Sequence, residues 1–221
     1  MGGVPPPGVE TTPLRPARRR RDIRYTARVR RVCIFCGSYS GIRPDYAAAA
    51  RAMAAALVRG GLELVYGGGR VGLMGILADE VLRLGGAVVG VIPRALRDRE
   101  VGHDGLTELH VVETMHERKA MMADLADAFV ALPGGLGTIE EIFEIWTWAQ
   151  LGMHQKPCGF LDVAGYYAPL AAFLDHATRE GFIRPQLRAA AIVESDPDTL
   201  LRRFAAYAPP AVEKWIDRAG T

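Results

Sequence analysis

The chain has 221 residues, of which 49% are hydrophobic and 24% charged, a composition typical of a globular protein with ample material for a core. The net charge of +2 is unevenly distributed along the chain. Residues 1–31 hold nine arginines and two acidic residues, a net charge of +7, so the other residues together carry −5. No stretch approaches the roughly 18 apolar residues of a membrane span. We therefore expect no membrane partner, and no broad basic surface for nucleic acid on the folded part.

Residues 1–30 are expected to form a disordered extension, because they are rich in Pro, Gly and Arg and lack apolar periodicity. A twin-arginine export signal is rejected, since no apolar region follows Arg21. An organelle transit peptide and a loose contact with RNA or acidic membrane are alternatives. We favour a solvated extension or a misassigned start codon.

The three cysteines are Cys33, Cys36 and Cys158. The first two have the C-x-x-C spacing of half a zinc or redox site, but they lie in an apolar run that predicts a strand. Their odd separation then puts the two thiols on opposite faces of the strand. No second Cys/His pair occurs at ligand spacing. We expect buried structural thiols in a reducing cytoplasm, and no metal or cofactor.

Predicted strands and helices alternate along the rest of the chain. Strands are expected at residues 32–36, 62–66, 87–92, 108–112, 129–132, 158–161 and 190–193. Helices are expected at residues 44–59, 73–84, 116–126, 138–151, 166–180 and 196–206. Short loops and near-continuous apolar strands indicate one α/β domain over residues 31–221. Its predicted architecture is a single doubly wound, Rossmann-like parallel sheet with helices on both faces.

Glycine-rich turns beginning at Gly37, Gly67 and Gly134 follow three of these strands. Ligands of doubly wound sheets bind beyond the carboxyl ends of the strands, where these turns should converge. The turn at Gly134 opens a helix, whose unpaired N–H groups and dipole favour a phosphate. No turn has the Gly-Lys-Ser/Thr of a Walker loop, and the strand at 87–92 lacks the acidic end of a dinucleotide site. A nucleoside monophosphate fits these parts better.

Three polar residues near this edge have more than one interpretation. Thr138 and Glu141 have the Thr-x-x-Glu spacing of a capping box, and catalysis by the glutamate is an equal alternative. Arg118 lies near a helix start, where the dipole disfavours a cation, so it is either functional or simply solvated. A pyridoxal phosphate enzyme would need a Schiff-base lysine, and only Lys119 is placed to serve.

Five motifs in sequence order carry a resemblance to a known family. They are CGSYSG at 36–41, YGGGRVGLM at 66–74, GVIPRAL at 90–96, MHERK at 115–119 and PGGLGTIEE at 133–141. Through them residues 31–206 resemble the Lonely Guy family of cytokinin riboside 5′-monophosphate phosphoribohydrolases, relatives of which are often labelled lysine decarboxylase.

The resemblance implies an N-glycosidase that cleaves a purine nucleoside 5′-monophosphate, with a cytokinin-type N6-substituted adenine, to free base and ribose 5-phosphate. It also implies a homodimer that needs no cofactor or metal. AMP or another nucleotide could be the substrate instead. A module that binds and senses a nucleotide without turnover is the alternative from a different class.

The resemblance assigns residues as well as an activity. Arg118 and Glu141 would be the catalytic pair. The substrate-binding residues would be Ser38, Gly68, Gly69, Glu100, Lys119, Gly134, Gly135, Leu136, Gly137, Thr138, Ile139, Glu140 and Thr147. Cleaving C1′–N9 builds positive charge on the ribose, which a nearby carboxylate stabilises. Candidates for an apolar base pocket are Met74, Met115, Met121, Met122 and Trp148.

Overall fold

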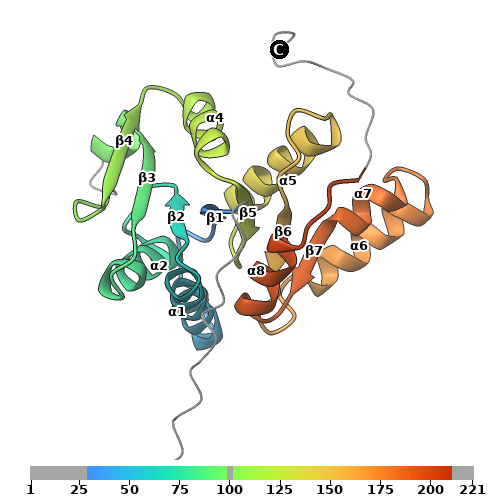
Figure 1. The fold of residues 1–221 in the computed structure, drawn as a ribbon, viewed down its shortest axis with the longest axis horizontal. Coiled ribbons are helices and arrows are strands. Elements are labelled where there is room, and N and C mark those ends of the chain that lie inside the picture. The colour runs from blue at the N-terminus through green and yellow to red at the C-terminus, as the bar shows by residue number, and fades with distance from the viewer. Residues whose placement is uncertain (1–28, 99–101, 211–221) are drawn as a thin grey trace, which may run out of the picture.

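A computed structural model of the protein describes residues 29–98 and 102–210 (Figure 1). Its strands are β1 Arg31–Phe35, β2 Glu63–Tyr66, β3 Val88–Pro93, β4 Glu108–Val112, β5 Ala128–Ala131, β6 Cys158–Leu161 and β7 Ala191–Glu194. They form one seven-stranded sheet in the order β4-β3-β2-β1-β5-β6-β7, and every neighbouring pair is parallel. The order runs outward in both directions from the β1–β5 pair. This confirms the predicted doubly wound, Rossmann-like fold.

Helices cover both faces of the sheet. They are α1 Pro44–Arg59, α2 Gly72–Arg83, α3 Arg94–Leu96, α4 Met115–Leu125, α5 Leu136–Gln150, α6 Ala168–Arg179, α7 Pro185–Ala190 and α8 Pro197–Ala205. On one face α1, α2 and α8 bury Met53, Leu77 and Phe204 against the strands. On the other face α4 and α5 bury Met122 and Ile142. Figure 1 shows α4 and α5 above the sheet and α1 and α2 below it.

The central strands are buried on both faces, which is why their sequences are continuous apolar runs rather than alternating ones. Cys33, in β1, packs in the core beneath α4 and α5, whereas Cys36, just after β1, packs in the core beneath α1 and α2. The prediction that these thiols face opposite sides is therefore confirmed. Both are buried and free, as is Cys158.

The predicted elements after β6 are partly wrong. The helix expected at 166–180 begins only at Ala168, because the turn after β6 continues through Tyr166 and Tyr167. The helix α7 was not predicted at all. It has only six residues, too few to show a helical apolar period, although Pro185 at its first position suits a helix start. Strand β7 consequently begins one residue later than expected, at Ala191.

Some predicted features lie outside the described residues. These are residues 1–28 of the expected extension, and Glu100, which falls in the gap at 99–101. The described chain begins with Val29, whose side chain is buried, and with Arg30, whose N–H donates to Asp127 Oδ2 at 2.8 Å. Within the described ranges, no helix is long and apolar enough to cross a membrane.

Candidate functional site

A crevice with a volume of about 590 Å³ opens at the carboxyl edge of the sheet, where the strand order reverses between β1 and β5. Its walls are the turn after β1 at residues 36–41, the turn and first helical residues after β5 at 133–138, and side chains from neighbouring helices and from the turn after β6. Those side chains belong to Tyr46, Leu73, Met74, Leu96, Arg118, Glu141 and Tyr166. The crevice therefore occupies the place where doubly wound folds bind ligands.

The turns after β1 and β5 touch each other through their backbones. Gly37 N–H donates to Pro133 O at 3.1 Å, and Gly37 O accepts from Leu73 N–H at 3.0 Å. A Cβ atom on Gly134 would lie 2.8 Å from Gly37 N and would overlap Thr138 Oγ1. Only glycine fits at position 134, because any side chain would push the two turns apart.

The first turn of α5 presents backbone N–H groups to this crevice. Its N-cap is Gly135, with no side-chain capping bond, and the first helical hydrogen bond is Ile139 N–H to Gly135 O at 3.2 Å. The capping-box interpretation of Thr138 and Glu141 is therefore wrong. The described capping box is on α4, between Thr114 and Glu117. The N–H groups that precede Ile139 have no acceptor within the helix and can bind an anion.

Arg118 and Glu141 face each other across the crevice floor. Arg118 Nη1 lies 3.1 Å from Glu141 Oε1, and the side chains are only 10% and 12% exposed. The rest of the guanidinium is held by main-chain carbonyls, with Nε donating to Val91 O at 3.2 Å and Nη2 to Gly67 O at 3.5 Å. A Cβ atom on Gly67 would overlap Arg118 Nη2, so the second glycine turn leaves room for this arginine.

Burial raises the pKa of the Glu141 carboxyl above its usual range, and the Arg118 guanidinium opposes that shift without cancelling it. The nearby carboxylates of Glu140 and Glu144 raise the pKa further. Glu141 is thus a carboxylate in poor contact with water, beside a fixed cation. Such a group can stabilise developing positive charge or accept a proton.

Lys119 points away from this pair. Its Nζ lies 2.7 Å from Glu140 Oε1 and 2.9 Å from Glu144 Oε2, and neither Lys119 nor Glu140 lines the crevice. Burial lowers the pKa of Lys119, but the hydrogen bonds to the two glutamates outweigh it, so the pKa is raised overall. A Schiff-base lysine must lose its proton to attack a carbonyl, and this environment opposes that loss.

The structure brings only some of the other predicted site residues together. Of these, Ser38, Gly134, Gly135, Leu136, Gly137 and Thr138 line the crevice. Four others do not line it. Ile139 packs beside the α4–α5 core, and Thr147 Oγ1 donates to Phe143 O within α5. Gly68 packs under Ile92, and Gly69 pairs with Gly102.

Of the candidates for an apolar base pocket, only one lines the crevice. Met74 lines the crevice, whereas Met122 is a core residue that is 1% exposed. Met115, Met121 and Trp148 are not among the crevice residues. Two crevice residues, Tyr46 and Tyr166, were not predicted as site residues and lie in none of the five motifs. Of these, Tyr166 could have been found from its position, because it closely follows the carboxyl end of β6.

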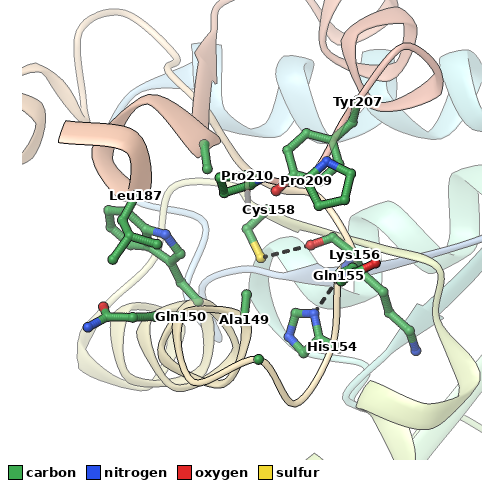
Figure 2. A pocket seen from close by; sticks show the side chains of 13 residues that line it. Ala149, Gln150, His154, Gln155, Lys156, Cys158, Leu187, Tyr207, Pro209 and Pro210 are labelled. Atoms are coloured by element: carbon green, nitrogen blue, oxygen red, sulfur yellow. Dashed lines mark hydrogen bonds between the residues drawn. The ribbon is translucent and has the colours of Figure 1, made fainter. Parts of the chain in front are cut away.

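A second hollow of about 70 Å³ lies at the opposite edge of the sheet, between the end of α5, α7 and the segment after α8 (Figure 2). Two of its polar side chains contact the protein's own main chain. His154 Nε2 lies 2.9 Å from Ile145 O, and Lys156 Nζ donates to Ala123 O at 2.7 Å. Burial raises the pKa of the Cys158 thiol to about 12, which makes it a poor nucleophile. The crevice is therefore the better candidate site.

Sequence comparisons identify close relatives of the chain. A family model described as "Possible lysine decarboxylase" matches residues 74–204. A cytokinin riboside 5′-monophosphate phosphoribohydrolase from Rhodococcoides fascians is 54% identical over 166 residues, which are 75% of this chain and 84% of that protein. One from Arabidopsis thaliana is 48% identical over 183 residues, 83% of this chain and 84% of that protein.

Solved structures with the same fold are more distant in sequence. The molybdenum cofactor binding protein from Rippkaea orientalis matches with a TM-score of 0.62 and 18% identity, over 82% of this chain and 98% of that chain. The molybdenum cofactor carrier protein from Chlamydomonas reinhardtii matches with a TM-score of 0.60 and 17% identity, over 81% of this chain and 100% of that chain. At these identities the likeness shows the fold alone.

Replacing Gly134 by alanine tests the contact between the turns. The added methyl group meets Thr138 Oγ1 and Gly37 N, so we expect a loss of about 1–3 kcal/mol in the free energy of unfolding. We also expect weaker binding of inorganic phosphate, measured by isothermal titration. Gly137→Ala is the matched variant, because its Cβ atom would meet nothing within 4 Å and alanine favours a helix. Equal stability losses in the two variants would show that the contact between the turns does not restrict position 134.

Proposed function

The chain belongs to the family of cytokinin riboside 5′-monophosphate phosphoribohydrolases, and we propose that its crevice hydrolyses the N-glycosidic bond of a nucleoside 5′-monophosphate. The products would be the free base and ribose 5-phosphate. The observation that carries the proposal is the buried Arg118–Glu141 pair beside the unpaired N–H groups of α5. A lysine decarboxylase is disfavoured, because the Lys119 amino group is held protonated by two glutamates.

The 5′-phosphate would bind at the start of α5. The N–H groups of Gly135, Leu136, Gly137 and Thr138 have no acceptor within the helix, and the helix dipole adds positive potential there. Ser38, on the facing turn, adds a hydroxyl to the same wall of the crevice. A phosphate held there places the ribose over the crevice floor, toward Glu141.

The chemistry would proceed through an oxocarbenium-like state. As the bond from C1′ to the base nitrogen breaks, positive charge builds on the ribose, and the Glu141 carboxylate stabilises it. Water then adds to C1′, its proton passes to Glu141, and the departing base gains a proton from solvent. Arg118 keeps Glu141 in place, and its guanidinium can donate to the ribose or to the leaving base.

The proposed base is a cytokinin-type adenine with an apolar N6 substituent. Two lines of support are the names of the relatives and the apolar side chains of Met74 and Leu96 on the crevice wall. AMP lacks that substituent, so it would leave the apolar wall uncovered. The ratio of the two turnover rates decides between these bases.

A cytoplasmic homodimer is our proposal for location and assembly. The three buried free thiols suit a reducing compartment. Apolar side chains that remain partly exposed lie on the outer helices of one face, with Met121 and Leu125 on α4 and Trp148 on α5. A second copy of the chain would cover such a surface.

The test of function is incubation of isopentenyladenosine 5′-monophosphate and AMP with wild-type protein and with Glu141→Gln. We expect free base and ribose 5-phosphate from the wild type, and a kcat lower by about 10²–10⁴-fold in the variant, because the amide carries no charge and takes no proton. Chromatography of the products gives the rates. Glu180→Gln is the matched control, since this glutamate is exposed at the end of α6. A folded wild type that binds nucleotides but releases no base would favour the sensing alternative.

The pH dependence follows from the raised pKa of Glu141. Catalysis needs the carboxylate, so kcat/KM should fall as the pH drops through a value above the 4.5 of an ordinary glutamate. The measurement is kcat/KM against pH, with circular dichroism at each pH to confirm folding. A rate that stays constant down to pH 4.5 in folded protein would argue against Glu141 as the ionised group.

Light scattering coupled to size-exclusion chromatography tests the assembly. At micromolar concentration we expect a mass of twice the 24.0 kDa of one chain. Trp148→Glu should shift this mass toward that of a single chain, because it places a charge on the proposed contact surface. A wild-type protein that elutes with the mass of one chain would rule out the dimer.

A further inference from the structure

Three successive carbonyl groups at the entrance to α5 each accept a hydrogen bond from a distant part of the chain. Leu132 O accepts from Tyr167 Oη at 2.7 Å, Pro133 O from Gly37 N at 3.1 Å, and Gly134 O from Tyr166 Oη at 2.5 Å. A peptide group is planar and trans, so its N–H points away from its C=O. Each bond to a carbonyl therefore also fixes the direction of the N–H that follows it.

Of the three peptide groups, the one between Gly134 and Gly135 depends most on such a bond for its orientation. A peptide between two glycines rotates more freely than any other, because neither residue has a Cβ atom. A Cβ atom on Gly135 would meet nothing within 4 Å, so packing does not restrain this peptide from that side. If it rotated, the Gly134 carbonyl would turn toward the crevice and repel an anion there.

The two tyrosines differ in their surroundings. Tyr167 is 2% exposed and packs in the core, whereas Tyr166 is 39% exposed and lines the crevice. The Tyr166 ring contacts Tyr46 edge-on, with centroids 5.7 Å apart, and Tyr167, with centroids 5.0 Å apart. These ring contacts hold the Tyr166 hydroxyl over the Gly134 carbonyl.

The turn that carries these tyrosines is itself strained. Ala164 has φ 53°, the only positive φ outside glycine in the described residues, and Gly165 follows with φ 76°. An alanine in this left-handed region costs on the order of 1–2 kcal/mol. Asp162 Oδ1 accepts from Tyr167 N–H at 2.7 Å and closes the turn. Strain of this kind persists where the surrounding structure requires it, and here the turn directs Tyr166 toward the loop.

We propose that Tyr166 is a positioning residue for the phosphate, which it serves by holding the Gly134–Gly135 peptide with the Gly135 N–H toward the crevice. The inference rests on the proposed function, in which a 5′-phosphate binds at this helix start. The bond from the tyrosine also polarises the peptide and makes the Gly135 N–H a better donor. Tyr166 thereby sets the preference of the site for a phosphorylated ligand over an unphosphorylated one.

Tyr166→Phe tests this role, because it removes the hydroxyl and keeps the ring contacts. We expect KM for the nucleotide and the inhibition constant for ribose 5-phosphate to rise about five- to tenfold, the loss typical of one hydrogen bond. The kcat should stay within about twofold, and inhibition by free adenine should not change. The matched control is Tyr207→Phe, the same change at the opposite edge of the sheet, which should leave every constant at its wild-type value.

A measurement without turnover separates this inference from the proposed function. In amide-resolved NMR of ¹⁵N-labelled protein, inorganic phosphate should shift the Gly135 resonance in the wild type, and about five- to tenfold more phosphate should be needed in Tyr166→Phe. That result supports the role of Tyr166 even if no base is released from any nucleotide. Equal phosphate affinity in the two proteins would overturn it. A fall in kcat with unchanged KM would overturn it too, because Tyr166 would then act on the reacting atoms.

Discussion

Moving an arginine and a glutamate out of water is unfavourable unless other polar groups replace the lost hydration. The protein meets this requirement for Arg118 with its own backbone, because the carbonyls of Val91 and Gly67 accept from Nε and Nη2 of the guanidinium, while Nη1 donates to Glu141. Glycine at position 67 leaves room for the guanidinium in this place, since a Cβ atom there would overlap Arg118 Nη2. Arg118 thus links α4 to α5 through its ion pair with Glu141, and to β3 and the turn after β2 through its other hydrogen bonds.

The turns after β1 and β5 are in close backbone contact, and this contact shapes the crevice wall. Gly37 and Gly134 bring the turns after β1 and β5 into hydrogen-bonding contact at the point where the strand order reverses. The peptide groups at this contact donate and accept among themselves and with the tyrosines after β6. The N–H groups at the start of α5 have no acceptor within the helix, so an anion proposed to bind there would be held by main-chain donors, with no lysine among the described residues of the crevice wall.

Adjacent residues on α4 and α5 serve different purposes. Arg118 and Glu141 face the crevice, while Lys119, Glu140 and Glu144 form a second cluster of charges outside it. The second cluster ties the same two helices together and holds the lysine in its protonated form. The fold thereby separates the proposed catalytic pair from a cluster of charges that links the helices. The description of the family model, possible lysine decarboxylase, does not fit this placement of Lys119.

The sequence by itself determined the sheet, most of its helices and the edge that carries the candidate site, because apolar runs of strand length and glycine-rich turns depend on local chemistry. It also singled out Arg118 and Glu141 through the motifs that contain them. Only the tertiary structure decided that Thr138 and Glu141 form no capping box, since the helix begins at Leu136, two residues earlier than the spacing suggested. It alone placed Lys119 outside the crevice and Tyr166 against Gly134. Such contacts join residues far apart in the chain, and their geometry arises only when the strands pair and the helices pack.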